Sequence, residues 1–335
     1  MTRARDYDES DVRVRPGRRG SRPRSKRRPE HADAADAMVT AVDRGRWTCA
    51  PGGDPRQPPV TAMRARELGR TPVVVGDRVG LVGDLSGDAD TLARIVRVED
   101  RTTVLRRTAD DTDPFERVVV ANAEQLVIVT AVADPTPRTG FVDRCLVAAY
   151  AGGLAPVLCL TKADLGDPAP FAAQYADLDL PVVVTRRDRP ITALVAVLAG
   201  RVSALVGHSG VGKSTLVNAL VPEADRAVGA VSAVGKGRHT TTAAIALPLP
   251  STDDGAPGWV VDTPGIRSFG LAHVTPDDVI AAFDDLAAAV EDCPRGCGHL
   301  GPPADPECAL DALVAAGHLR RGRLAALRRV LVALR

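Results

Sequence analysis

Apolar residues in the second half of the chain form short unbroken runs that alternate with segments of helical period. The runs predict buried strands over 125–132, 154–160, 181–185, 201–206, 243–249 and 258–261. The segments between them predict helices over 140–152, 171–178, 191–198 and 216–220. Buried strands that alternate with amphipathic helices are typical of a parallel sheet covered on both faces. We therefore expect an α/β fold, whose ligands bind at the carboxyl ends of the strands.

The first half of the chain shows a different pattern, in which short strands are broken by Gly, Asp and Pro. Such strands are predicted over 38–50, 72–82, 92–98 and 117–120. Residues 74–79 (VVGDRV) combine a turn with the two-residue period of a barrel strand. About 80 residues of this kind fit a small five-stranded barrel of the OB type, a common oligonucleotide-binding fold. An SH3-like barrel fits the same pattern equally well.

The strand over 201–206 runs into a glycine-rich loop, GHSGVGKS at 207–214, and then into a helix. In that context GxxxxGK[ST] is a phosphate-binding loop, because the glycines let backbone N–H groups converge on phosphate oxygens. Lys213 is expected to reach the β- and γ-phosphates as a catalytic charge, and the Ser214 hydroxyl to ligate Mg²⁺. The sequence offers no partner for His208, and we expect an ordinary loop histidine. The candidate nucleotide-binding residues of this loop are Gly207, His208, Ser209, Gly210, Val211, Gly212, Lys213, Ser214 and Thr215.

A second motif, TKAD at 161–164, comes directly after a buried strand. The Asp164 carboxylate can accept two hydrogen bonds, from the ring N–H and the exocyclic amine of guanine, a pattern that adenine does not offer. The alkyl stem of Lys162 can lie over the base. Together with the phosphate-binding loop, Thr161, Lys162 and Asp164 predict a guanine nucleotide site.

A third motif, DTPG at 262–265, follows the strand over 258–261. Asp262 is placed to reach the Mg²⁺ shell, and the backbone N–H of Gly265 to meet the γ-phosphate. Both residues are therefore added to the candidate nucleotide-binding set.

The residues around these motifs bear on hydrolysis. One of the threonines at 240–242 is expected to add a hydroxyl to the Mg²⁺ shell, and we take it to be Thr241. Ile266 stands where many GTPases have a glutamine that orients the attacking water. Hydrolysis is therefore expected to be slow unless another group places the water, either His239, a catalytic candidate by its position, or an external group.

Lysine is rare in this chain, because arginine has replaced it almost everywhere. The four lysines are Lys26, Lys162, Lys213 and Lys236. Three of them lie within or beside the candidate nucleotide motifs, where the planar guanidinium of arginine is no substitute for a compact ammonium. The composition therefore favours a lysine-specific role at these positions.

The N-terminal residues 1–36 are polar and basic, and 13–28 hold nine Arg or Lys and no acid. Such a segment cannot bury a core and is expected to be disordered. Its charge suits the phosphates of RNA or DNA, and a solvated tail is the alternative. The net charge of the whole chain is only +1. The N-terminus lacks an apolar signal-peptide core, and no apolar run reaches the length of a membrane span, so we expect a cytoplasmic protein.

Three of the six cysteines lie within sixteen residues near the C-terminus. With a nearby histidine they form the pattern Cys293-x₃-Cys297-x-His299-x₈-Cys308. Three thiolates and one imidazole satisfy tetrahedral Zn²⁺, and a full set of four protein ligands indicates a structural site. Buried free cysteines beside a surface histidine are the alternative. Residues 319–335 predict a basic amphipathic helix, which either packs on the protein or contacts rRNA.

The order of the motifs identifies the family. In ordinary GTPases the phosphate-binding loop comes first, whereas here TKAD precedes it and DTPG comes last. This order indicates a circular permutation, which leaves the site intact but moves the termini. The chain resembles the RsgA (YjeQ) family of ribosome small-subunit-dependent GTPases over about residues 38–312. Besides the three motifs, the resemblance rests on VVGDRV (74–79), LRR (105–107), VANAEQLVIV (120–129), GRHTTT (237–242) and DTPGIRSFG (262–270).

The resemblance implies an OB barrel, a permuted P-loop GTPase domain and a zinc-binding, mainly helical C-terminal domain. We accordingly divide the chain into a basic arm (1–36), a barrel (37–118), a GTPase domain (119–272) and a C-terminal domain with a basic helix (273–335). One departure is Thr161, where the family has an asparagine. The amide that braces the base loop is then missing, and the hydroxyl of Thr161 is expected to compensate for it in part.

The function implied is that of a monomeric, Mg²⁺-dependent GTPase with one structural Zn²⁺. It would bind the small ribosomal subunit through its rRNA, assist late maturation of that subunit and be stimulated by it. Two alternatives stay open. Ile266 favours an RNA-binding nucleotide switch with negligible turnover, and Thr161 leaves room for an ATPase.

Overall fold

The computed structural model describes residues 31–69, 71–88, 90–107, 117–222, 244–250, 258–263, 271 and 274–334. The predicted basic arm falls almost wholly outside these residues. So do three candidate site residues, His239, Thr241 and Gly265, together with Ile266.

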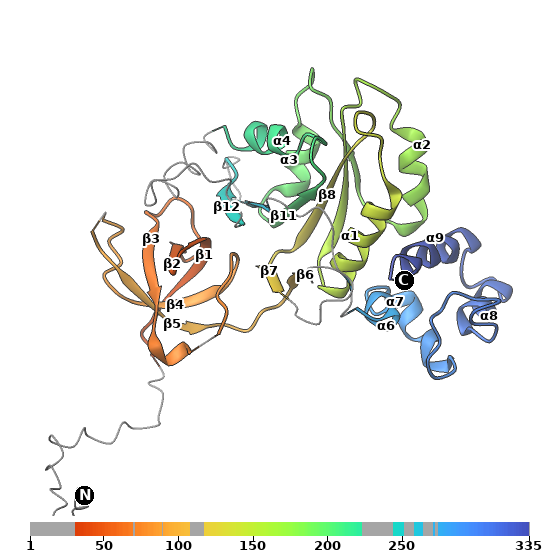
Figure 1. Cartoon of the computed structure of the whole chain (residues 1–335), viewed down its shortest axis with the longest axis horizontal. Helices are drawn as coiled ribbons and strands as arrows, with labels where there is room; N and C mark the ends of the chain where they lie inside the picture. Colours follow the sequence, from red (N-terminus) through yellow and green to blue (C-terminus); the bar gives the residue numbers. More distant parts are fainter. Residues whose placement is uncertain are drawn as a thin grey trace, which may run out of the picture. The chain divides into compact units, whose positions relative to one another are not determined.

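A five-stranded barrel opens the described chain (Figure 1). Its strands are β1 (Ala35–Asp43), β2 (Arg46–Pro51), β3 (Val60–Arg64), β4 (Arg78–Gly83) and β5 (Ala93–Val98). Strand β1 pairs with both β2 and β4, and β3 runs parallel to β5, so the order β1-β2-β3-β5-β4 closes on β1. This closed order is that of an OB barrel and removes the SH3-like alternative.

Two details of the barrel differ from the prediction. The strand predicted over 38–50 is a hairpin, because Arg44 and Gly45 both have positive φ and turn the chain between β1 and β2. Strand β3 was missed, because its five residues, VTAMR, alternate buried and exposed side chains over too short a length to give a signal. A 3₁₀ turn, η2 (Arg66–Leu68), follows it.

A buried carboxylate fixes the turn that leads into β4. Asp77 is fully buried. Its two oxygens accept hydrogen bonds from the Nε and Nη2 of Arg101 at 2.7 and 2.9 Å, and Oδ2 also accepts from the backbone N–H of Val74 at 2.8 Å. One side chain therefore ties the turn to the segment that follows β5.

We expect Asp77→Ala to lower the free energy of unfolding by about 3–5 kcal/mol, because it leaves a largely buried guanidinium without its carboxylate. Urea unfolding followed by circular dichroism measures this. The control is Asp54→Ala, which removes an exposed ion pair with Arg56 and should change stability little. Equal effects of the two substitutions would contradict the role assigned to Asp77.

A second sheet region follows a two-stranded ribbon of β6 (Val104–Arg107) and β7 (Arg117–Ala121). Its strands lie in the order β10-β9-β8-β11-β13-β12, all parallel except β12 (Figure 1). Their bounds are β8 (Gln125–Ala131), β9 (Ala155–Thr161), β10 (Val182–Val184), β11 (Val202–Gly207), β12 (Ile245–Pro248) and β13 (Trp259–Asp262). Strand β12 also pairs with β1 of the barrel, through Ala41 and Ile245.

Helices cover both faces of this sheet, as the buried runs predict. Along β8, Leu126 and Ile128 belong to the same apolar cluster as α1 (Thr139–Ala151), while Val127 and Val129 belong to the cluster with α3 (Thr192–Leu198) and α4 (Lys213–Leu220). The helix predicted over 171–178 is a single turn of α-helix, α2 (Ala169–Ala172), continued by the 3₁₀ segment η3 (Ala173–Leu178).

The order in which strands are added to the sheet changes direction between the neighbouring parallel strands β8 and β11. From β8 the chain proceeds outward to β9 and β10, and from β11 it proceeds to the other side, where β13 and β12 lie. A crevice forms at such a switch point, beyond the carboxyl ends of the two central strands. The glycine-rich loop follows β11 directly and so lies at this crevice.

The C-terminal region is built from short helices. They are α6 (Pro276–Ile280), α7 (Asp284–Ala287), η4 (Ala289–Asp292), α8 (Ala309–Ala315) and α9 (Arg321–Val332). None of the helices in the described ranges has the length and apolar character needed to cross a membrane.

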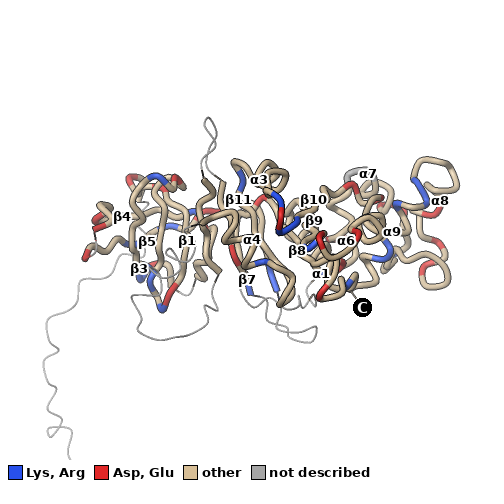
Figure 2. The backbone as a smooth tube through the Cα atoms, turned by 90° about the horizontal axis from the view of Figure 1, so that it is seen from above, with Lys and Arg blue, Asp and Glu red and all other residues tan. Residues whose placement is uncertain are grey.

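The basic helix α9 packs on α1 and η3 (Figure 1). Its Arg323 pairs with Asp179, and Arg320 just before it lies within 3.7 Å of Asp177 and Asp179, so basic residues face acidic ones at this contact. The basic positions along α9 are marked in Figure 2. Arg329 lies over the ring of Tyr175 at 4.7 Å, and its Nε is 3.6 Å from Asp143. Of the two readings left open by the sequence, the packing helix is the one that these contacts support.

Candidate functional site

The glycine-rich loop joins β11 to α4 as predicted. Gly207 ends the strand, and a Cβ there would lie 2.7 Å from the carbonyl oxygen of Val129 on β8, so only glycine allows this approach. Gly212 has φ +96° just before Lys213 starts the helix. The loop thus brings backbone N–H groups and a helix N-terminus to one point, which is what phosphate binding needs.

Lys213 and Asp262 meet at the carboxyl ends of neighbouring strands. The parallel register sets Leu205 opposite Asp262, and the Lys213 ammonium forms an ion pair with the Asp262 carboxylate. The hydroxyl of Thr263 donates to the carbonyl of Leu205 and fixes the backbone beyond β13. The cation predicted for phosphate and the carboxylate predicted for a metal shell therefore lie side by side, although they are 49 residues apart in the chain.

The base loop is tied to the phosphate loop by Thr161. Its hydroxyl donates to the carbonyl of Val211, and the carbonyl of Thr130 lies 3.3 Å away as a second possible acceptor. The single hydroxyl hydrogen serves one of these acceptors at a time, whereas an asparagine amide has two hydrogens. The Thr161 hydroxyl thus links the base loop to the phosphate loop, in partial compensation for the missing amide, as predicted.

The other two residues of the base motif lie where they can reach a base. Lys162 has φ +57°, and its ammonium donates to the carbonyl of Asp134. Asp164 is exposed, and within the described part of the chain its carboxylate accepts a single, long hydrogen bond, 3.4 Å, from the backbone N–H of Arg187. Its carboxylate is therefore accessible to the two donors of a guanine.

A pocket of about 300 Å³ lies between the phosphate loop and the start of α1. Its lining includes His208 and Ser209 and also Arg138, a residue outside the predicted site. The ring of His208 packs on Phe141 of α1 with 4.0 Å between centroids. Burial, and to a lesser degree the charge of Arg138, lowers the pKa of His208.

His208 is therefore not the unpartnered loop histidine that the sequence suggested. The aromatic partner is 67 positions away in the chain and gives no sequence signal by itself. The sequence holds one weak signal for Arg138. It follows the strand β8, so it is expected at the same sheet edge as the motifs.

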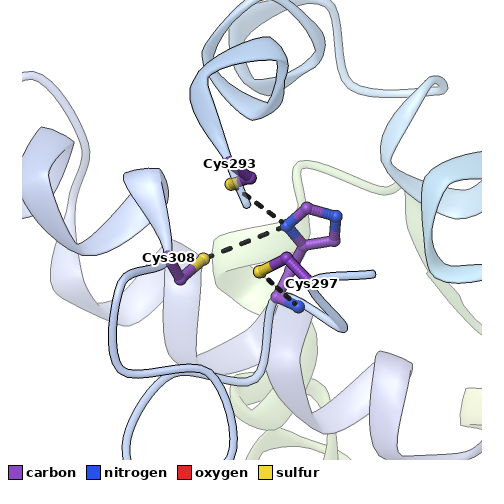
Figure 3. Close-up of side chains that lie close together, drawn as sticks. Cys293, Cys297 and Cys308 are labelled. Carbon is purple, nitrogen blue, oxygen red and sulfur yellow. Dashed lines mark hydrogen bonds between the residues drawn. The ribbon is translucent and has the colours of Figure 1, made fainter. Parts of the chain in front are cut away.

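The four predicted zinc ligands lie together in the C-terminal region (Figure 3). One ligand atom from each of Cys293, Cys297, His299 and Cys308 lies within 4.8 Å of all the others. The Nδ1 of His299 is 3.5 Å from the Cys293 sulfur and 3.9 Å from the Cys308 sulfur. The four residues thus form a cluster that could hold a metal ion. His299 is buried, so the alternative of free cysteines beside a surface histidine does not describe this region.

The surroundings of the cluster suit a cation. The Nε2 of His299 lies 2.9 Å from Asp277, which orients the ring so that Nδ1 faces the sulfurs. Backbone N–H groups of His299 and Ala309 donate to the sulfurs of Cys297 and Cys293 at 3.4 and 3.3 Å. Burial and then the neighbouring thiolates raise the pKa of Cys297 to about 12. A bound cation would remove that penalty, so the donor set fits a thiolate-binding metal.

The structure leaves part of the predicted site undescribed. His239, Thr241 and Gly265 lie outside the described residues. Their assignments stay predictions. The described part of the site holds the phosphate loop, the base loop and Asp262.

Comparisons with known proteins agree with this geometry. A family model described as RsgA GTPase matches residues 98–272. The chain is 39% identical over 263 residues to the small ribosomal subunit biogenesis GTPase RsgA of Alcanivorax borkumensis, covering 76% of this chain and 71% of that protein. It is also 39% identical over 262 residues to the protein of the same name from Gemmatimonas aurantiaca, covering 76% and 82%.

Two solved structures share the fold. The crystal structure of YjeQ from Thermotoga maritima matches with a TM-score of 0.61 and 26% identity, over 90% of this chain and 98% of that one. YloQ, described as a circularly permuted GTPase, matches with a TM-score of 0.62 and 21% identity, over 92% and 97%. The predicted fold class is confirmed by these likenesses, together with the barrel order, the strand order and the metal-ligand cluster.

Proposed function

Because this chain belongs to the RsgA GTPase family, we propose that it hydrolyses GTP on the small ribosomal subunit and assists the late maturation of that subunit. The observation that carries the proposal is the meeting of the phosphate loop, the base loop and Asp262 at one sheet edge. The name of these relatives, small ribosomal subunit biogenesis GTPase, supports the choice of partner.

The chemistry proposed is in-line attack of water on the γ-phosphorus of GTP. A bond forms from the water oxygen to the γ-phosphorus, and the bond to the β–γ bridging oxygen breaks. GDP and phosphate leave, and the water protons pass to phosphate and solvent. The Lys213 ammonium and the backbone N–H groups of residues 209–213 stabilise the charge that builds on the phosphate oxygens.

Magnesium is proposed as the ion that accompanies GTP, and it would supply further positive charge at the β- and γ-oxygens. In this protein the Ser214 hydroxyl and the Asp262 carboxylate would hold it, and Thr241 would be the third ligand. Asp262 would then exchange its ion pair with Lys213 for the metal shell, which frees the ammonium for phosphate. Thr161, Lys162 and Asp164 are proposed to select guanine.

Zinc is proposed as the ion of the Cys293, Cys297, His299 and Cys308 cluster, at one per chain. Three thiolates and an imidazole make a closed tetrahedral set with no position left for water, which is the pattern of a structural site. Its role would be to hold together a region of short helices that has little core of its own.

The organisation of the molecule belongs to the same proposal. We retain the division into an arm (1–36), a barrel (37–118), a GTPase domain (119–272) and a C-terminal domain (273–335). Arg78 and Arg94 are exposed on the barrel strands, which supports rRNA contact through that part. A cytoplasmic monomer fits this role.

A passive nucleotide switch is the second candidate, and Ile266 favours it. Steady-state GTP hydrolysis, measured with and without purified small ribosomal subunits, distinguishes the two. We expect small subunits to stimulate turnover by at least about tenfold and large subunits to have no effect, because an external group can supply the missing water placement. Tight nucleotide binding without stimulation would contradict the ribosome-triggered GTPase and favour the passive switch.

A further inference from the structure

We propose that Arg138 is a catalytic residue of this chain, whose guanidinium contacts the γ-phosphate of bound GTP from within the same protein. The inference rests on the proposed function, because it assigns a role in the same reaction. It gives the site a second cation besides Lys213, and it concerns a residue outside all three nucleotide motifs.

The position of Arg138 is set by the fold. Strand β8 and the phosphate-loop strand β11 are neighbours in the sheet, so the loop after β8 and the loop after β11 leave the same edge together. Arg138 is the residue before α1, at the end of the first of these loops. It lines the same 300 Å³ pocket as Ser209, near the middle of the phosphate loop.

The backbone of Arg138 is held in place by the first turn of α1. Its carbonyl accepts hydrogen bonds from the N–H groups of Phe141 and Val142 at 3.2 and 3.4 Å. The ring of Phe141 packs in turn on His208 of the phosphate loop. The base of the Arg138 side chain is therefore linked to the phosphate loop by a short run of contacts, so the two should move little relative to each other.

The guanidinium of Arg138 is available for a ligand. The residue is exposed, and no described group forms a hydrogen bond or ion pair with its side chain. Arg323 and Arg329 on α9 differ in this respect, because both lie against acidic or aromatic partners. The guanidinium belongs to a residue that lines one pocket with His208 and Ser209 of the phosphate loop, so its charge lies close to that loop.

His208 assists this arrangement by staying neutral. A protonated imidazole in the same pocket would repel the guanidinium and compete with it for phosphate oxygens. Burial against Phe141 disfavours that charged form.

The reaction has a use for a second cation. Negative charge on the phosphate oxygens must be stabilised in the transition state, and an arginine supplied from the same chain is one established means in GTPases. A guanidinium offers five donors in a planar fork, suited to two oxygens at once. Arg138 would neither gain nor lose a proton, so the balance of water, GTP, GDP and phosphate is unchanged. Such a residue would sustain intrinsic hydrolysis despite Ile266.

The experiment compares the full-length protein with Arg138→Ala and Arg138→Lys in single-turnover GTP hydrolysis without RNA. Arg138→Ala should lower the rate by about 100-fold, with the affinity for GDP changed by less than about threefold. Arg138→Lys should recover only part of the rate, because an ammonium lacks the fork. Arg321→Ala, which removes an exposed arginine of α9, is the matched control and should hydrolyse GTP like the unmodified protein.

A second readout separates a catalytic from a structural role. GDP with aluminium fluoride mimics the transferring phosphoryl group, so Arg138→Ala should weaken binding of that complex by about the same factor as the rate, and of GDP alone hardly at all. Equal losses for GDP and the mimic, or an unchanged rate, would overturn the inference and leave the proposed function standing. Failure of the unmodified protein to bind or hydrolyse GTP at all would instead refute the proposed function.

Discussion

Lys213→Ala is expected to lower the rate of GTP hydrolysis by at least about 1,000-fold while the protein stays folded. Lys213 is the first residue of α4, at the point where the phosphate loop turns into the helix. Its present partner is Asp262 of the DTPG motif, the predicted magnesium ligand. Removing Lys213 therefore takes charge from the phosphate oxygens and leaves the carboxylate without its neighbour.

The size of the expected loss follows from where the charge acts. An interaction that strengthens as the γ-phosphate leaves lowers the barrier directly, whereas one that holds GTP and its transition state equally changes only binding. Lys213 is proposed to contact the β–γ region of GTP, so both effects are expected and the rate effect should dominate. Single-turnover hydrolysis and nucleotide titration, measured on the same preparation, separate them.

Lys213→Arg provides a sharper version of the same test. The chain uses arginine almost everywhere, so retention of lysine here predicts that arginine fails. We expect Lys213→Arg to be nearly as inactive as Lys213→Ala, because a planar fork does not fit the space of a compact ammonium. Lys26→Ala, at the lysine of the N-terminal arm, is the control and should retain full activity. Full activity of Lys213→Ala would refute the assignment of the phosphate loop.

The elements that carry the site could be predicted from sequence because their signals are local. The phosphate loop combines a buried apolar run with glycines at fixed spacing, and the structure starts α4 at Lys213 as expected. Likewise, the four metal ligands lie within sixteen residues, so a short chain must bring them close. Even the permutation could be seen, because it is a statement about the order of motifs along the chain.

What could not be predicted depends on contacts between distant segments. The packing of His208 on Phe141 and the ion pair of Lys213 with Asp262 arise from the strand order, which no local pattern specifies. The brace from Thr161 to Val211 is a similar case, since a hydroxyl and a carbonyl are 50 residues apart. The docking of α9 was undecided for another reason: a basic amphipathic helix has the same composition whether its partner is acidic protein or RNA.

Cys297→Ser should abolish stoichiometric metal binding and destabilise residues 274–334. A serine oxygen is a poor replacement for thiolate sulfur on zinc, and the remaining three ligands leave an open position. Unmodified protein should carry about one zinc per chain by elemental analysis, and the variant much less. Cys49→Ala is the control, because Cys49 is a buried barrel cysteine outside the cluster, and this variant should keep its zinc.

The destabilisation has a definite size and place. If free zinc exceeds its dissociation constant a thousandfold, the metal contributes about 4 kcal/mol to folding, and the variant loses that amount. Because Arg328 donates to the carbonyl of His299 and pairs with Asp311, the loss should spread from the cluster to α8 and α9. Amide hydrogen exchange should then be faster across 309–332 than across β8 and β11. Chelation of the unmodified protein should reproduce this pattern, and a variant that retains both its zinc and its exchange protection would rule out the cluster as a structural metal site.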